Sequence, residues 1–303
     1  MNKQIVSSQT ICDFSFVQLR VQPADSFQYK TLSSAMAEGF IEIREVHQGG
    51  NVNRLMAINR SDFFIFLMDG DILVGAKQNR VLNTSILLAP KSETIIPVSC
   101  VERGRWRHVS PQFASSPDIA HAKLRAFKSR SVASHLKSGE AHLADQAGVW
   151  EQVQCCALAA KTESPTESLS DVFAKKRAEF EASAASLCPA RDANGLAIFR
   201  GGRMVSLDLF HRAEVLADYL PKLARGALME SVFDESHQMA PPLPELEAKA
   251  LAALERVAHS PGETHPAVSV GSERRFEDAQ CVGFELKHEA YSIHLSILPR
   301  DSD

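Results

Sequence analysis

The sequence contains no long apolar run. Its longest apolar stretches, FFIFLM at residues 63–68 and TIIPV at residues 94–98, are only as long as a strand. A helix that crosses a bilayer needs roughly 20 apolar residues. The first residues hold an early lysine but no apolar segment of the kind that directs secretion. We therefore expect a cytoplasmic protein without a membrane segment.

The motifs of several common chemistries are missing as well. The six cysteines are scattered and form no CxxC pair, which favours reduced thiols over a disulfide framework or a zinc site. There is no HExxH, GxGxxG or GxSxG motif, and GAKQNR at residues 75–80 lacks the GKS or GKT ending of a phosphate loop. The sequence thus predicts no metal ion and no cofactor.

The chain also lacks a strong excess of positive charge. Its 303 residues carry a net charge of -4, and 45% of them are hydrophobic, which is enough for a sizeable core. Proteins that coat nucleic acid are usually far more basic. A nucleic-acid partner is therefore disfavoured, and any surface that binds an anion must be local. The oligomeric state is not indicated.

What the chain does contain first is a series of short strands. Residues 1–115 hold Val-, Ile- and Phe-rich segments about ten residues apart, separated by Gly, Asn, Asp or Pro. This spacing predicts an antiparallel sandwich or barrel-like sheet. One interruption, YKTLSSAMAEG at residues 29–39, predicts a short helix that ends at Gly39.

The rest of the chain changes period. Residues 116–190 predict a helical region, with helices over 119–136, 145–160 and 168–187 and the first helix beginning at Ser116–Asp118. Residues 191–303 predict a mixed region with hairpins over 195–210 and 281–298 and helices over 211–233 and 241–260. Strands, then helices, then mixed elements indicate an α+β fold. The three regions are compatible with one compact domain.

The stretch VSCVERGRW, residues 98–106, concentrates reactive side chains. If it is a strand, Cys100 and Glu102 share one face, and Ser99 lies on the other. A neighbouring carboxylate disfavours the thiolate that a nucleophile needs. Two interpretations remain open. Either Cys100 and Glu102 are catalytic, or Cys100 is a small buried residue and Glu102 binds an arginine, in the first place Arg105.

A second polar group follows Gly75, which predicts a bulge or a close backbone approach within a strand. Gln78, Asn79 and Arg80 come in succession, and their planar side chains have directional donors suited to phosphates, carboxylates or base edges. The alternative is a hairpin turn with polar tips. Buried polar groups must be satisfied by some partner.

The third feature is a basic segment. Between Arg103 and Lys137 lie eight Lys or Arg residues and a single acid, Asp118. On a helix, His121, Arg125 and Lys128 would form one stripe. Such a stripe either concentrates an anionic ligand or is a solvated face that complements acids elsewhere.

Several phrases of the chain together resemble a mostly bacterial family. They include DGDILVGAKQNRVLNTSILL, IPVSCVERGRW, DQAGVW and CVGFELKHEAYSIHLSIL. The family is named for its association with ADP-ribosylglycohydrolase and rhodanese/phosphatase-type proteins. The resemblance implies a context of ADP-ribose, nucleotides or phosphorylated metabolites. Its most specific phrases surround Gly75 and Trp106, and Asp71 stands where a glutamate would be expected.

Three hypotheses follow, and they leave open whether any reaction is catalysed. The first is a site for an anionic, nucleotide-like small molecule, such as ADP-ribose or a phosphorylated metabolite. The second is a scaffold or partner-binding module in which the same polar cluster is structural. The third is a nucleic-acid binder that uses the basic segment. For the first, the catalytic candidates are Glu102 and Cys100, and the ligand-binding candidates are Gln78, Asn79, Arg80, Ser99, Arg105, Trp106 and Arg125.

Overall fold

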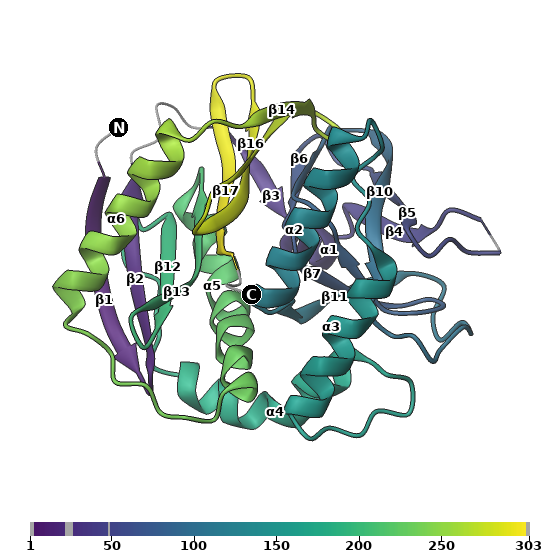
Figure 1. Cartoon of the computed structure of the whole chain (residues 1–303). Coiled ribbons are helices and arrows are strands. Elements are labelled where there is room, and N and C mark those ends of the chain that lie inside the picture. Colours follow the sequence, from purple (N-terminus) through teal and green to yellow (C-terminus); the bar gives the residue numbers. More distant parts are fainter. Residues whose placement is uncertain (1–2, 22–26, 48, 301–303) are drawn as a thin grey trace.

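The computed structural model describes residues 3–21, 27–47 and 49–300. Strands from the beginning and from the end of the chain belong to one antiparallel sheet (Figure 1). Its eight strands lie in the order β1 (Lys3–Ile11), β2 (Phe14–Val21), β12 (Gly195–Arg200), β13 (Arg203–Phe210), β17 (Tyr291–Pro299), β16 (Cys281–His288), β15 (Ser272–Glu277) and β14 (Glu263–Pro266). The expected hairpins over 195–210 and 281–298 are confirmed. The edge strand β1 was not expected, because its polar sequence KQIVSSQTI has little hydrophobic periodicity.

The remaining β-rich residues form two smaller sheets. The six-stranded sheet has the order β11 (Phe113–Ile119), β7 (Asp71–Gly75), β8 (Arg80–Leu82), β10 (Ser92–Cys100), β5 (Arg54–Asn59) and β4 (Ile41–Glu45), and its outer strands β11 and β4 also contact each other. It therefore curls into a small barrel. A three-stranded sheet contains β3 (Tyr29–Thr31), β6 (Phe64–Leu67) and β9 (Ile86–Leu88), with β3 and β6 parallel.

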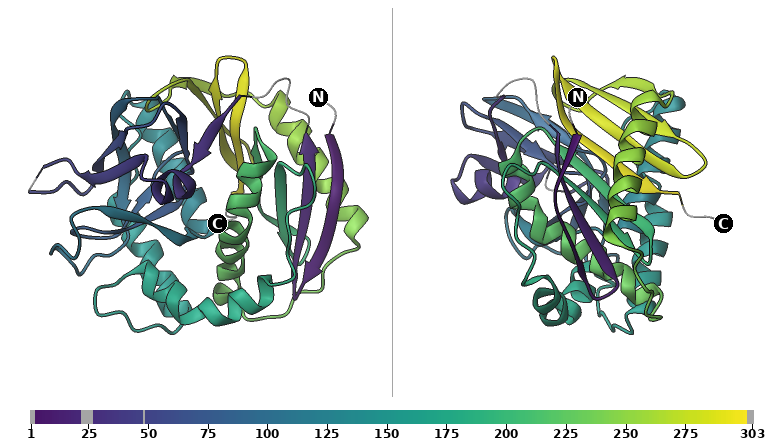
Figure 2. Two further views of the ribbon diagram at one scale, coloured as in Figure 1. Left: turned by 180° about the vertical axis from the view of Figure 1, so that it is seen from behind. Right: turned by 90° about the vertical axis from the view of Figure 1, so that its left-hand side faces the viewer.

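Helices cover both faces of the eight-stranded sheet (Figure 2). Helix α6 (Leu243–His259) packs Leu246 and Ala250 against Val17 and Leu19, whereas α5 (Ala213–Leu228) packs on the opposite face. The two faces alternate along β2, as the period of a strand requires. The other helices are α1 (Leu32–Ala37), α2 (Ala122–Lys137), α3 (Gln146–Ala159), α4 (Leu169–Ala184) and the 3-10 helix η1 (Met229–Phe233).

Helix α2 connects the two large sheets. It contacts β16 and β17 of the eight-stranded sheet, and its Lys128 binds the carbonyl oxygen of Leu82 on β8. The barrel is filled by its own apolar cluster, which includes Leu55, Ile96 and Val98. The fold is α+β, as the order of the elements predicts.

One element boundary was predicted wrongly. Residues 116–119 do not begin a helix but belong to β11, where Ile119 pairs with Asp71 of β7. The Asp118 carboxylate is bound by Arg177 and Arg225. Helix α2 starts at Ala122, three residues after the expected start. Among the described residues, no helix has both the length and the apolarity needed to cross a membrane.

Candidate functional site

The predicted polar cluster is real, and its centre is closed. Arg105 binds the Glu102 carboxylate with Nε 2.8 Å from Oε1 and Nη2 2.6 Å from Oε2. Oε1 also accepts from the Thr166 hydroxyl, and Oε2 accepts from the Asn79 backbone amide. Burial alone would raise the pKa of Glu102, but these donors, led by Arg105, lower it. Both carboxylate oxygens are therefore occupied, and the expected contact between Glu102 and Arg105 is present.

Asn79 and Gln78 belong to the same closed network. The Asn79 side chain accepts from Arg105 and from the Gly75 amide, and its amide group donates to Ser168 and Ser170. Gln78 donates to the carbonyl of Glu102. Gly75 has a φ of +125°, and a Cβ there would lie 2.5 Å from the Ser110 hydroxyl. It would also lie 2.8 Å from the backbone oxygen of Gln112, which confirms the expected close backbone approach. The Gln78 and Asn79 side chains link the turn between β7 and β8 to the residues after β10 and to the start of α4.

Cys100 has the geometry of a structural thiol. It is fully buried, it pairs with Arg80 across β8 and β10, and its backbone is held by the side chain of Gln146. Burial raises the pKa of the Cys100 thiol, although Arg80 opposes this. A neutral, enclosed thiol is a poor nucleophile. Ser99 is equally buried, and its hydroxyl donates to Asn83.

Arg80 is the least satisfied member of the cluster. Its Nη1 donates to the Gln78 side chain at 3.0 Å, but Nε and Nη2 have no hydrogen-bond partner among the described residues. The Glu45 carboxylate lies 3.8 Å from Nη2, beyond hydrogen-bond range. Trp106, half-exposed, lies over the guanidinium with its ring 5.9 Å away.

The basic segment is not a surface stripe. His121, Arg125 and Lys128 are all buried, so this stripe is not a solvated helix face, and a ligand-binding role for Arg125 stays a prediction. Arg125 binds Asp208 of β13 through two nitrogens and Asp69 through Nε, and Lys128 lies 2.7 Å from the other oxygen of Asp69. These groups are too far inside the molecule to be a surface site. They join α2 to both large sheets, and all three nitrogens of the Arg125 guanidinium donate to buried side chains, including the Ser296 hydroxyl.

His121 leads to a different region. Its Nδ1 lies 3.2 Å from Glu230 of η1, and the same carboxylate oxygen accepts from the backbone amide of Lys123. Burial alone would lower the pKa of His121, but Cys156 and Glu230 raise it to about 10. Glu230 therefore supplies the negative charge that the start of α2 favours, and it also lines a pocket.

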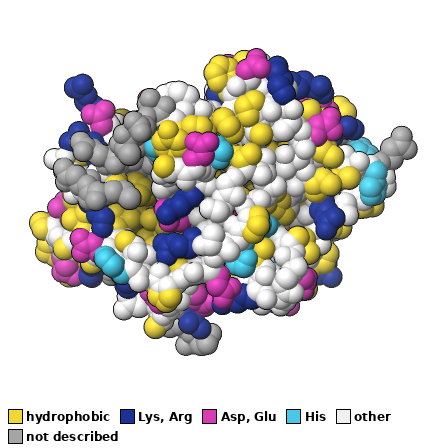
Figure 3. All heavy atoms as spheres, turned by 90° about the horizontal axis from the view of Figure 1, so that it is seen from above, with side chains coloured by type: hydrophobic (Ala, Val, Ile, Leu, Met, Phe, Trp, Pro, Cys, Tyr) yellow, Lys and Arg dark blue, Asp and Glu magenta, His cyan; other side chains and the backbone are white. Residues whose placement is uncertain are grey.

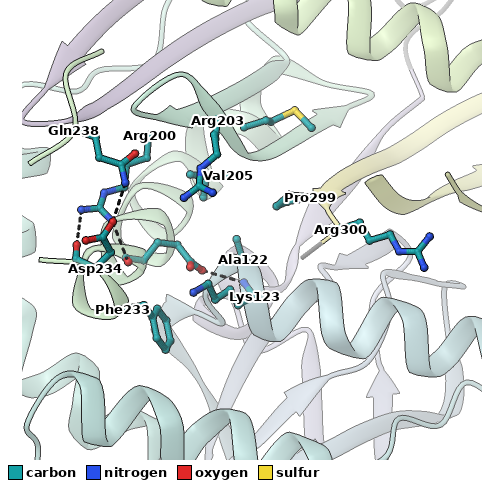
Figure 4. A pocket seen from close by; sticks show the side chains of 12 residues that line it. Ala122, Lys123, Arg200, Arg203, Val205, Phe233, Asp234, Gln238, Pro299 and Arg300 are labelled. Atoms are coloured by element: carbon teal, nitrogen blue, oxygen red, sulfur yellow. Dashed lines mark hydrogen bonds between the residues drawn. The ribbon is translucent and has the colours of Figure 1, made fainter. Parts of the chain in front are cut away.

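That pocket lies between the start of α2, the β12–β13 turn and η1 (Figure 4). Its volume is about 310 Å³. Four cations and two acids line it: Lys123, Arg200, Arg203 and Arg300, with Glu230 and Asp234. Figure 4 shows Lys123 and Arg203 pointing into the space and Arg200 on one side, where it donates to the carbonyl of Asp234 at 2.6 Å.

The cations of this pocket differ in how well they are neutralised. Arg200 binds Asp13, and Arg300 lies 3.6 Å from Glu277. No carboxylate of the described residues lies within ion-pair distance of Lys123 or Arg203. The Lys123 ammonium instead rests 4.2 Å from the centre of the Phe233 ring. Hydrogen bonds from Ser236 and Gln238 lower the pKa of Asp234 to about 2, so this carboxylate is ionised at neutral pH.

The sequence did not point to this pocket. The phrase IFRGGR reads as a hairpin turn, and it is one, but Arg200 and Arg203 on either side of Gly201–Gly202 enter the pocket. Arg200 and Arg203 come from this hairpin, and Arg300 follows β17. Only the folded chain brings these three arginines to the same pocket as Lys123. In the part of the chain that the structure describes, no group of three or more His, Cys, Asp or Glu side chains is arranged to hold a metal ion.

The surface seen from above gives no sign of an extended basic face. Basic side chains occur there in small groups among acidic and apolar ones (Figure 3). The apolar side chains that are large and well exposed are spread along the chain, from Phe63 to Met239.

Comparison with known proteins assigns the family. The model of the ARG and Rhodanese-Phosphatase-superfamily-associated Protein domain, ARPP-1, matches residues 3–298. The chain belongs to this family, in agreement with the resemblance of its phrases. No curated protein and no solved structure gives a significant match.

Proposed function

We propose that this protein binds an anionic small molecule, phosphorylated or nucleotide-like, in the pocket formed by Lys123, Arg200, Arg203 and Phe233. The observation that carries the proposal is that Lys123 and Arg203 line one pocket without any acidic partner among the described residues. Two uncompensated cations in a recess raise the local concentration of anions. An arginine also offers a planar fork that matches phosphate and carboxylate oxygens.

The size of the pocket supports a small ligand. Small-molecule sites usually enclose roughly 300–1,000 Å³, and this pocket of about 310 Å³ lies at the lower end. It would hold a phosphate with one sugar or base more easily than a long dinucleotide. Glu230 already accepts a hydrogen bond from the Lys123 amide in the first turn of α2, so we propose that side chains bind the charge of the ligand. The family name, with its phosphatase association, supports a phosphorylated ligand.

This proposal moves the ligand away from the cluster expected from sequence. Glu102 and Arg105 satisfy each other, which favours a structural role for them, the second of the hypotheses above. A ligand-binding role for Arg80 and Trp106 stays a prediction. The pocket holds no cysteine, and we propose binding without assigning a reaction.

Calorimetry with AMP, ADP-ribose and inorganic phosphate tests the proposal. Replacing one charged donor costs about 1.5–3 kcal/mol, so Arg203→Ala and Lys123→Ala should each weaken binding about tenfold or more. Arg191→Ala, which removes an exposed arginine that does not line the pocket, is the matched control and should bind as the wild type does. The pocket is rejected if none of the three compounds binds, or if Arg203→Ala has no effect. In the latter case, loss of binding in Trp106→Ala would place the ligand at the cluster expected from sequence.

A further inference from the structure

Glu45 and Arg80 meet inside one end of the barrel with most of their hydrogen-bonding groups unused. Glu45 ends β4 and Arg80 begins β8, and their exposed fractions are 7% and 0%. Both carboxylate oxygens, and Nε and Nη2 of the guanidinium, have no hydrogen-bond partner among the described residues. Four buried polar atoms of two neighbouring side chains are thus without a hydrogen-bond partner among the described residues.

Leaving such groups unsatisfied is costly. A buried polar atom without a partner costs about 1–3 kcal/mol, and more when it is charged. A direct Glu45–Arg80 hydrogen bond would remove this cost, yet the two groups stay 3.8 Å apart. Arg80 is held by Gln78, which is itself bound to the Glu102 carbonyl, and Glu45 is held by its pairing with Leu55 of β5. The pair is therefore held open.

The cover over this pair is thin. The Trp106 ring lies above the Arg80 guanidinium and is 49% exposed. A Cβ on Gly50 would lie 3.4 Å from the Trp106 ring and 3.5 Å from a Glu45 carboxylate oxygen, so these three residues meet at the barrel end. Gly50 has a φ of +76°, and the Lys77 ammonium lies 5.1 Å from the Trp106 ring. The mouth of a barrel is a frequent place for a small ligand.

The charges at this position select the chemistry of the ligand. An anion would be attracted by Arg80 but repelled by Glu45, and a cation would meet the opposite pair of forces. A neutral group with a donor beside an acceptor satisfies both, because guanidinium only donates and an ionised carboxylate only accepts. The indole of Trp106 offers a flat face on which a planar group can stack.

We propose that the barrel end beneath Trp106 binds a planar, uncharged group that carries a hydrogen-bond donor next to an acceptor, such as the edge of a nucleobase or a carboxamide. The acceptor of the ligand accepts a hydrogen bond from Nη2 or Nε of Arg80, and the donor of the ligand donates a hydrogen bond to the Glu45 carboxylate. This site is separate from the cationic pocket and does not depend on the anion-binding proposal.

Tryptophan fluorescence tests the site directly. The chain has two tryptophans, so a Trp150→Phe background leaves Trp106 as the reporter. The probes are adenine, cytosine and nicotinamide, with inorganic phosphate and guanidinium as charged counterparts. We expect at least one of the three uncharged probes to change the emission of Trp106 at a concentration at least tenfold lower than either charged probe.

Variants separate this site from the cationic pocket. Glu45→Gln keeps the shape and replaces one acceptor by a donor, so it should weaken binding about tenfold or more. Arg203→Ala should leave it unchanged. If Glu45→Gln prevents folding, Trp106→Ala, monitored by calorimetry, takes its place and should abolish binding. The inference fails if no uncharged probe binds or if the charged probes bind equally well. It also fails if the folded Glu45→Gln variant, or Trp106→Ala in its place, binds the probe as the wild type does.

Discussion

The Arg105 guanidinium donates a hydrogen bond to each oxygen of the Glu102 carboxylate, and both side chains are more than nine-tenths buried. Arg105 also donates to the backbone carbonyls of Gly75, Ala76 and Arg107. The pair therefore ties the residues after β10 to the turn between β7 and β8, a link that no single strand provides.

Removing Arg105 should destabilise the protein strongly. Breaking a buried ion pair from one side costs about 3–5 kcal/mol, because the remaining charge is left without a partner. We expect Arg105→Ala to lower the free energy of unfolding by that amount, measured by urea denaturation. Arg107→Ala, an exposed arginine two residues away, should change it by less than about 0.5 kcal/mol. Equal stability of the two variants would contradict the closed network.

The thiols should divide into two groups of equal size. Cys12, Cys155 and Cys188 are exposed, whereas Cys100, Cys156 and Cys281 are buried. Burial, together with Asp278, raises the pKa of Cys281 to about 11, and burial also raises the pKa of Cys100. We expect three thiols to react rapidly with Ellman's reagent at pH 8 and all six after denaturation in guanidinium chloride.

Peptide mapping identifies which thiols react first. Rapid modification of native Cys100 would revive the nucleophile hypothesis, because only an accessible thiolate reacts quickly. Its protection would agree with a structural role.

Acid should weaken the protein partly through Glu273. Burial alone would raise the pKa of this carboxyl, but Arg275 and His142 lower it to about 2. A depressed carboxyl pKa stabilises the fold above the unfolded-state value, about 4.3, and this contribution disappears as the pH falls towards 2. A shift of this size corresponds to about 3 kcal/mol. Urea unfolding at pH 7, 4 and 3 should show a falling free energy.

Glu273→Gln is the matched variant for that titration. It is less stable at pH 7, since it removes a buried ion pair with Arg275. Its stability should fall less steeply between pH 4 and pH 3 than that of the wild type. Parallel pH profiles for the two proteins would show that Glu273 does not titrate in this range.

The fold class and most elements followed from local patterns. The strand expected at FSFVQLRV and the helix expected from the spacing in 243–259 are both present, although β2 is buried on both faces whereas α6 buries one. The contact between Glu102 and Arg105 could also be expected, because the two residues are only three positions apart. Local periodicity failed at residues 116–119, where pairing with β7 and two arginines distant in sequence outweighed the helix-start pattern.

By itself, the sequence determined most of the strands and helices, the polar character of the GAKQNR and VSCVERGRW phrases, and the resemblance of the chain to its family. Only the tertiary structure decided what those side chains are available to do. It buried Arg125 between Asp69 and Asp208, paired Glu102 with Arg105, and brought Lys123 and Arg203 into one pocket. It also left two nitrogens of Arg80 and both carboxylate oxygens of Glu45 without a hydrogen-bond partner among the described residues. Whether a charged side chain is free or neutralised depends on partners that are far away in the sequence. Residue type and local spacing do not reveal which partners these are.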